Sequence, residues 1–289
     1  MKKEYLSLVV ANFIWASGHP LAKFVLKEIH FLHMAMLSSV LGLAAIGLAL
    51  LSLRKWETLR SFERRDFLFI FMAGLLMFSL YPILTFSALA RIPASLNSLI
   101  IGSNPIFVTL LSWLLLRERT TGRALLGVAL AFLGLATVIL GTSELGLQRL
   151  DLLGVYISLT GAFTAGTYPI LGRVVMRKGD ALAATALAHL VGSILLSFLV
   201  AQTLGFQPIV AASFPVKAMF TYWGVGAAFA YVIYYWVLKK MEARKAGSFN
   251  YLVPIFATIL SFLLLGENLG LPFFGGMALT FLGIKLAQE

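Results

Sequence analysis

The sequence predicts an all-α integral membrane protein in which ten transmembrane helices form two inverted five-helix repeats. Three observations support this fold class. First, 60% of the 289 residues are hydrophobic and 12% are charged, whereas soluble domains carry roughly a quarter charged residues. Second, apolar runs of about 20 residues, long enough to span a bilayer as a helix, recur along nearly the whole chain. Third, landmark residues of the first half recur 149 positions later, which indicates a tandem duplication.

The duplication keeps one constant offset without a gap. The matching positions are Pro20/Pro169, Ala35/Ala184, Leu89/Leu238, Ala94/Ala243, Pro105/Pro254, Glu118/Glu267, Gly127/Gly276 and Gly134/Gly283. Duplicated halves of a membrane protein usually face each other around a transport pathway. We therefore expect a first repeat over residues 1–140, a linker over 141–151 and a second repeat over 152–289.

Charge clusters and turn residues divide the chain into ten candidate helices. Helices are expected because unpaired backbone groups are costly in lipid. The predicted spans are 5–26, 31–53, 67–90, 94–116, 122–140, 152–175, 181–204, 216–238, 244–265 and 270–288. The links between them are short, so each helix is expected to pack against its neighbours in sequence.

The distribution of basic residues predicts the orientation of these helices. If the N-terminus is cytoplasmic, 18 of the 23 Lys and Arg residues fall on the cytoplasmic side, and the positive-inside rule then places both termini there. The net charge of +11 is explained by this topology, so no nucleic-acid partner is expected. The absence of cysteine excludes a disulfide framework and a thiolate metal site, and neither a metal nor a cofactor is expected.

Five spans per half is an odd number, so the two halves must enter the membrane in opposite orientations. The loop after the fourth span supports this, because Arg117 and Arg119 flank Glu118 there. At the matching corner of the second half, Gly266 and Asn268 flank Glu267. The corner carries positive charge in one half only, as an inverted repeat around a midplane site requires.

Several fragments of the chain carry a family resemblance: the 12–23 stretch, Ala88-Leu89 with Ala94, Ser103-Asn104-Pro105, Leu116 to Arg119, Gly127, Gly134, Pro254, Gly266-Glu267, Gly276 and Gly283. In this order and spacing they resemble the drug/metabolite transporter superfamily, in the branch built from two EamA-type domains. The resemblance covers essentially the whole chain. It implies a ten-helix carrier of small metabolites, often an exporter of amino acids or related compounds, that works by alternating access. It also implies a central cavity lined mainly by helices 1, 3, 4, 6, 8 and 9, with helices 5 and 10 outlying. In one departure, the Trp-Gly pair of the family's first helix reads Trp15-Ala16 here, with the glycine at Gly18.

Polar side chains are costly inside a bilayer, so those that occur tend to face a cavity or a partner. In the first helix, spacings of 3, 4 and 4 place Asn12, Trp15, His19 and Lys23 on one stripe under about 90° wide. We expect this stripe to line the pathway. In the alternative, Trp15 packs, His19 bonds to neighbouring backbone, and Lys23 reaches the outer interface.

Five further helices supply the other expected substrate-binding residues. The sixth helix carries a threonine stripe that either lines the pathway or bonds back to its own helix. Pro82 and Tyr231 share the 149-residue offset, so the tyrosine-rich regions of the third and eighth helices are expected to face each other. A proline leaves the carbonyl group four residues earlier without its helical hydrogen bond. At Pro105 and Pro254 this either supplies a binding group and a point for gating, or simply kinks the helix. The expected residues are Ser79, Tyr81, Thr85, Asn97, Asn104, Thr160, Thr164, Tyr168, Tyr231, Tyr234, Tyr235, Asn250 and Tyr251.

All twelve acidic residues fall in loops or at span ends. This argues against proton antiport through a buried carboxylate and against a strongly cationic substrate. If protons are coupled to transport, His19 is the better candidate, because imidazole titrates near physiological pH. His189, in a seventh helix expected to be peripheral, is expected to pack. Glu118 and Glu267 are expected to cap the helices that follow them.

The expected function is secondary transport or export of small metabolites at a midplane site between the repeats. Amino acids or related zwitterionic or aromatic compounds are the expected substrates, with Lys23 or His19 engaging a substrate carboxylate. Two alternatives stay open: export of drugs, dyes or nucleotide-linked metabolites, and a non-transporting receptor or structural role. An enzyme is not expected, because no carboxylate at membrane depth could orient a catalytic base. The expected partners are the lipid bilayer of a prokaryotic cytoplasmic membrane and the metabolite, and the two halves predict a functional monomer.

Overall fold

The computed structural model describes residues 2–117, 121–142, 151–175, 180–265 and 271–288. The structure is 90% helical, and the described residues contain no strand, which confirms the all-α fold class. The elements are α1 (Lys2–Val25), α2 (Phe31–Ser52), η1 (Trp56–Ser61), α3 (Arg64–Leu75), η2 (Leu76–Leu80), α4 (Tyr81–Arg91), α5 (Ala94–Gly102), α6 (Asn104–Leu116), α7 (Gly122–Thr142), α8 (Leu152–Val175), α9 (Ala181–Thr203), α10 (Gln207–Ala211), α11 (Phe214–Leu238), α12 (Ala243–Ser248), η4 (Phe249–Tyr251), α13 (Leu252–Leu265) and α14 (Leu271–Gln288).

Every predicted span corresponds to one of these helices or to a consecutive run of them, and three of the spans are interrupted. The third is α3, a π-helical turn η2 and α4; the fourth is α5 and α6; the ninth is α12, η4 and α13. Each interruption lies just before a proline, at Pro82, Pro105 or Pro254. A proline has no N–H for the carbonyl four residues earlier, so the regular ladder is broken there. The elements η1 and α10 lie in segments expected to be loops.

Five of the described helical segments are long and apolar enough to cross a membrane. They are Phe31–Ser52, Arg64–Arg91, Ala181–Thr203, Phe214–Leu238 and Lys245–Leu265; the stretches Gly122–Gly134 and Phe274–Ala287 are shorter apolar helices. Many large apolar side chains on the long helices point outward, as a bilayer requires. The crossing of the membrane by all ten segments stays a prediction.

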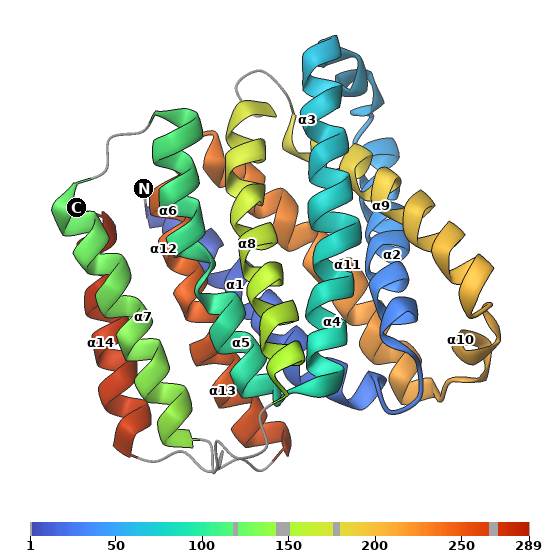
Figure 1. Cartoon of the computed structure of the whole chain (residues 1–289). Coiled ribbons are helices and arrows are strands. Elements are labelled where there is room, and N and C mark those ends of the chain that lie inside the picture. The colour runs from blue at the N-terminus through green and yellow to red at the C-terminus, as the bar shows by residue number, and fades with distance from the viewer. Residues whose placement is uncertain (1, 118–120, 143–150, 176–179, 266–270, 289) are drawn as a thin grey trace.

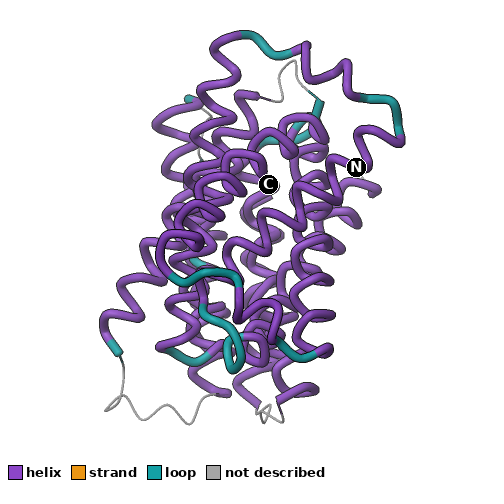
Figure 2. Tube along the Cα trace, turned by 90° about the vertical axis from the view of Figure 1, so that its right-hand side faces the viewer, coloured by secondary structure: helices purple, strands orange, loops and turns teal. Residues whose placement is uncertain are grey.

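Figure 1 shows the ends marked N and C at the same end of the bundle, and successive long segments running in alternating directions. The first helix α1 runs away from that end, whereas its equivalent α8 runs toward it, as inverted halves require. Figure 2, turned by 90°, shows the helices following the long axis of the molecule. Several positions named in the sequence analysis lie outside the described residues. They are the corner residues Glu118 and Glu267, most of the expected linker, and the basic residues Arg119, Arg149, Arg177 and Lys178.

Helix packing follows the duplication. Helix α1 packs on α11 and α13, and its equivalent α8 packs on the corresponding segments of the other half, α3 to α4 and α5 to α6. Helices α2 and α9, which are equivalent, pack against each other, and so do α7 and α14. Exchanging the two halves therefore reproduces the same set of helix contacts. The pair α7 and α14 lies at one side of the bundle (Figure 1).

Candidate functional site

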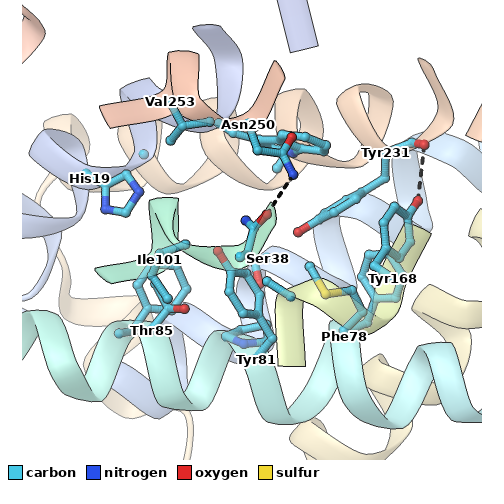
Figure 3. A pocket seen from close by; sticks show the side chains of 18 of the residues that line it. His19, Ser38, Phe78, Tyr81, Thr85, Ile101, Tyr168, Tyr231, Asn250 and Val253 are labelled. Atoms are coloured by element: carbon cyan, nitrogen blue, oxygen red, sulfur yellow. Dashed lines mark hydrogen bonds between the residues drawn. The ribbon is translucent and has the colours of Figure 1, made fainter. Parts of the chain in front are cut away.

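A cavity lies between the two halves and contains about 960 Å³ of empty space, including its open part. All six of the helices expected to line it contribute residues, and so do α2 and α9. Figure 3 shows a close view of it. The lining residues are Trp15, Gly18, His19, Ser38, Met77, Phe78, Tyr81, Pro82, Thr85, Phe86, Leu89, Ile101, Gly102, Asn104, Ala165, Tyr168, Pro169, His189, Trp223, Ala227, Tyr231, Tyr234, Asn250 and Val253.

The lining draws on equivalent positions of the two repeats. Six pairs of lining residues are separated by the 149-residue offset: His19/Tyr168, Phe78/Ala227, Pro82/Tyr231, Thr85/Tyr234, Ile101/Asn250 and Asn104/Val253. Because equivalent positions meet at the axis that relates the halves, the cavity straddles the seam between them. The residue types within a pair differ, so the two halves present different chemistry to whatever occupies the cavity.

Aromatic rings make up one wall of the cavity. The ring centroid of Tyr231 lies 5.0 Å from that of Trp15, 4.9 Å from that of Phe78 and 5.0 Å from that of Tyr168. Trp15 also contacts Tyr234, with ring centroids 5.4 Å apart. These separations and tilted geometries are the ones that aromatic side chains prefer. The wall is therefore suited to stacking against a planar or apolar part of a ligand.

The polar groups of the cavity are neutral hydrogen-bonding groups. Asn250 donates its Nδ2 hydrogen to Asn104 Oδ1 over 3.1 Å, and Tyr168 donates its hydroxyl hydrogen to the Tyr231 carbonyl over 3.2 Å (Figure 3). Asn250 Oδ1 and His19 Nδ1 are buried without a hydrogen-bond partner among the described residues. None of the described lining residues is Asp, Glu, Lys or Arg. A ligand here finds hydrogen-bond donors and acceptors but no counter-charge.

Nine of the residues expected to bind substrate line this cavity. In the helix 1 stripe these are the two central members, Trp15 and His19. The third, fourth, sixth, eighth and ninth spans contribute the others, and the structure brings them together although they come from both repeats. They are Tyr81, Thr85, Asn104, Tyr168, Tyr231, Tyr234 and Asn250.

The two outer members of the helix 1 stripe do not reach the cavity. Asn12 is fully buried and donates from Nδ2 to the Leu8 carbonyl over 2.7 Å. Lys23 donates from Nζ to the carbonyls of Leu89 and Ile92, over 2.7 and 3.0 Å. These carbonyls end α4, where a cation is favoured by the helix dipole. In this arrangement Lys23 ties α1 to the end of α4.

The threonine stripe of α8 is bonded to its own helix. Thr160 donates to the Tyr156 carbonyl over 3.0 Å, and Thr164 donates to the Thr160 carbonyl over 2.8 Å, which is the alternative that the sequence left open. Asn97, on α5, also lies outside the cavity lining. Its Oδ1 accepts a hydrogen bond from Ser158 Oγ over 2.7 Å, which ties α5 to α8.

Three further expected residues support the site from behind or lie away from it. Ser79 donates to the Gly74 carbonyl over 3.2 Å within the π-helical turn. Tyr235 stacks on Tyr168 with ring centroids 4.4 Å apart and an angle of 9° between the rings. Tyr251 is fully buried and donates to a backbone carbonyl of α7 over 3.3 Å.

Several lining residues were not expected from the sequence, among them Trp223 and His189. Each packs against a glycine that could have indicated the contact. A Cβ on Gly18 would lie 2.3 Å from the Trp223 ring, and a Cβ on Gly42 would lie 2.6 Å from His189 Cε1. His189 packs on the Phe78 ring, with centroids 4.0 Å apart, and also lines the cavity. Its helix α9 packs on α2, which carries the His189 ring to the cavity wall.

The chain matches the EamA-like transporter family over residues 2–140 and 152–287. It belongs to the EamA-like transporter family. An uncharacterized transporter of Archaeoglobus fulgidus is 26% identical over 289 residues, with 98% of each chain covered. The uncharacterized transporter YoaV of Bacillus subtilis is 24% identical over 290 residues, covering 98% of this chain and 96% of YoaV.

Another relative of this EamA-like chain is named a "Probable terminal-alkyne amino-acid exporter" and comes from Streptantibioticus cattleyicolor. It is 25% identical over 273 residues, which cover 92% of this chain and 87% of the relative. A solved crystal structure matches with a TM-score of 0.80 at 20% identity, over 99% of this chain and 96% of that one, and supports the fold. With its apolar helices, the family membership makes the chain an integral membrane transporter with bacterial and archaeal relatives.

Proposed function

We propose that this chain exports small metabolites by alternating access through the cavity between its two repeats. Amino acids and related zwitterionic or aromatic compounds are the substrates that the cavity suits best. The observation that carries the proposal is the lining itself, in which equivalent positions of both halves meet around a ring-rich space, and none of the described lining residues is ionised. A named amino-acid exporter among the relatives supports the same substrate class.

The aromatic wall favours substrates with a planar or apolar body. Tyr231 contacts three other rings within about 5 Å, so its own orientation is fixed before a ligand arrives. A preorganised wall loses little conformational entropy on binding, which increases the affinity it can provide. The polar part of the substrate meets His19 and the Asn104–Asn250 pair instead. The Lys23 ammonium group is already hydrogen-bonded to carbonyls at the end of α4, so His19 is the better partner for a substrate carboxylate.

Alternating access needs contacts that can break at one end of the molecule while they hold at the other. Helices α1 and α11 pack together and are tied at both ends. At the end marked N, Lys240 Nζ lies 3.0 Å from Glu4 Oε1. At the opposite end, Glu28 accepts hydrogen bonds from the backbone N–H and the hydroxyl of Ser213, each over 2.7 Å. Opening the cavity to one side would break one tie and leave the other.

The orientation and the unit of function follow from the same features. The segment from the end of α2 to the start of α3 lies at the same end as both chain termini (Figure 1) and carries Arg54, Lys55, Arg60, Arg64 and Arg65. The positive-inside rule makes that end cytoplasmic, in the cytoplasmic membrane of a prokaryote. One chain supplies both repeats, over 1–140 and 152–289, and completes the cavity, which supports function as a monomer.

Flux measurements on proteoliposomes test the proposal. Vesicles containing the full chain are loaded with labelled L-tryptophan, L-phenylalanine or L-leucine, and release is compared with empty vesicles. Tyr81→Ala and Tyr231→Ala are expected to slow release at least about tenfold, because burial of an aromatic side chain contributes about 1.5–3 kcal/mol. Tyr156→Ala is the matched control, since this tyrosine is 69% exposed on the outer face of α8. No flux for any of these amino acids, or wild-type flux in both cavity variants, would sink the proposal.

A further inference from the structure

Lys23 and Gly172 are equivalent positions of the two repeats, related by the 149-residue offset. Each follows a cavity-lining residue by one helical turn, Lys23 after His19 on α1 and Gly172 after Tyr168 on α8. Figure 3 shows His19 and Tyr168 at opposite ends of the cavity. Because α1 runs away from the chain termini and α8 runs toward them (Figure 1), Lys23 lies beyond the cavity at the far end, opposite the termini. Gly172 lies beyond it at the end of the termini.

At the far end, Lys23 bridges two helices that line the cavity. Its Nζ donates to the carbonyls of Leu89 and Ile92, over 2.7 and 3.0 Å, and Leu89 itself lines the cavity. Pro93 follows the end of α4 and has no N–H, so it cannot donate to the carbonyl four residues earlier, that of Leu89. The ammonium group donates to this carbonyl instead. Hydrogen bonds from a charged donor are roughly twice as strong as neutral ones, so the contact holds α1 firmly to α4.

At the end of the termini, the equivalent contact is apolar. A Cβ on Gly172 would lie 2.3 Å from Tyr235 Cε1 and 3.0 Å from Leu238 Cδ1, so α8 and α11 make direct contact at this glycine. Leu238 is the equivalent of Leu89. The two contacts therefore join the same pair of positions, once in each orientation. One contact is made by a charged donor, and the other by close packing.

Inverted repeats place such equivalent contacts at opposite sides of the membrane. Alternating access moves the repeats against each other around a fixed site, so a contact that crosses the cavity at one end must break when that end opens, while its equivalent holds. Lys23 joins α1 to α4, and Gly172 joins α8 to α11, and all four helices line the cavity. These contacts add to the two ties between α1 and α11, which involve neither α4 nor α8.

From these contacts we infer that Lys23 and Gly172 are the gating positions of the two ends, with a charged contact at the far end and a glycine-dependent apolar contact at the end of the termini. The inference rests on the proposed alternating access and assigns its gates. Opening the far end leaves an ammonium group and two carbonyls that need new partners, and water entering from that side supplies them. Opening the other end uncovers apolar surface only. The two ends therefore open through different chemistry, and single substitutions shift them separately.

Thiol labelling from each side of the membrane tests the inference, because the chain has no cysteine of its own. Ser38→Cys is a near-isosteric reporter that lines the cavity between its two ends (Figure 3). Two exposed positions identify the sides: Trp56→Cys, 45% exposed, marks the terminus side, and Val210→Cys, 67% exposed in α10, marks the far side. A charged, membrane-impermeant methanethiosulfonate is applied to intact cells and to inverted membrane vesicles that contain the full chain. The labelling rate of the reporter is then measured from each side.

The two gate variants are expected to change labelling from opposite sides. Lys23→Met is expected to raise far-side labelling of Ser38→Cys at least about tenfold, since labelling follows the population open to that side, without raising terminus-side labelling. Gly172→Ala displaces the ring packed on it and is expected to raise terminus-side labelling at least about threefold, without raising far-side labelling. Lys217→Met is the matched control, because Lys217 Nζ donates over 2.8 Å to the Val210 carbonyl of the turn before its own helix. It is expected to stay within about twofold of the wild-type rates.

A cooperative melting transition shows that a variant folds. Tryptophan-dependent thermal stabilisation shows that its cavity still binds, because a ligand that binds only the folded state raises its stability. If Lys23→Met does not fold, Lys23→Gln replaces the charged donor with a neutral one and is expected to raise far-side labelling at least about threefold. Unchanged far-side labelling in a folded Lys23 variant overturns the inference. Equal increases from both sides in either gate variant also overturn it.

Tryptophan release from proteoliposomes tests the proposed function separately. Release combined with wild-type labelling in both gate variants overturns the inference alone. Labelling shifts on the expected sides without release of any tested amino acid support the gates and overturn only the proposed substrates. Absence of release together with wild-type labelling in both gate variants overturns both the inference and the proposed function.

Discussion

The contact between α7 and α14 depends on glycine, and a single methyl group tests how closely the two helices approach. A Cβ added to Gly283 of α14 would lie 2.3 Å from the backbone nitrogen of Ala131 in α7, and 2.7 Å from its Cα and Cβ. None of these atoms can rotate away. Ordinary contact begins near 3.4 Å, so Gly283→Ala requires the helices to part by about 1.1 Å.

The cost follows from that separation. A gap of about 0.5–1 Å forfeits a quarter to a half of the dispersion energy of the atoms that move apart. Forcing an extra methyl into a packed site costs about 1–3 kcal/mol. Alanine has a higher helix propensity than glycine and returns at most about 1 kcal/mol. We expect Gly283→Ala to destabilise the chain by about 1–2 kcal/mol.

Thermal melting of the purified chain in one detergent checks this value. A loss of this size is expected to lower the melting temperature by about 2–8 °C for a chain of this size. Gly275→Ala on the same helix is the control, because nothing lies within 4 Å of its added Cβ, and its melting temperature should equal or exceed that of the wild type. Cavity ligands should bind both variants normally, since no described residue of α7 or α14 lines the cavity. Equal melting temperatures for the two variants would refute the reasoning.

Three other predictions concern the cavity and the end of the bundle opposite the two chain termini. Lys23→Met removes two charged hydrogen bonds to the end of α4 and is expected to cost about 1.5–3 kcal/mol in thermal melting; a loss of tryptophan binding with unchanged melting would show that Lys23 serves the substrate instead. The hydrogen bonds from the Ser213 backbone and hydroxyl hold the pKa of Glu28 below its usual 4.5, so this tie stabilises the fold above that pH and is lost as pH falls through the lowered pKa. The melting difference between wild type and Glu28→Gln should therefore be present at about pH 7 and shrink toward about pH 3; a constant difference would contradict the assignment. Gly18→Ala pushes the Trp223 ring from a position 2.3 Å from the new Cβ, and is expected to weaken tryptophan binding at least about tenfold in the same thermal assay; unchanged binding would show that the ring moves away from the cavity.

The sequence predicted the helical segments closely. Spans predicted at 152–175 and 181–204 are observed as Leu152–Val175 and Ala181–Thr203, because apolar runs and the polar residues that end them are local signals. The constant offset also predicted that the seam would pass between Pro82 and Tyr231, and both line the cavity. Helical periodicity further selected the central members of the helix 1 stripe.

The sequence by itself determined the family, the helical class and the two repeats, because composition, periodicity and duplication are properties of the chain. Only the tertiary structure decided which polar side chains reach the cavity. A helical stripe fixes the direction of a side chain but not the neighbour it meets. Lys23 therefore donates hydrogen bonds to carbonyls at the end of α4, and Thr164 donates to a carbonyl of its own helix. The converse holds for His189, on a helix that no local signal marks as facing the cavity. Packing of α9 on α2 carries its ring there, because contacts between distant segments depend on how all the helices fill space together.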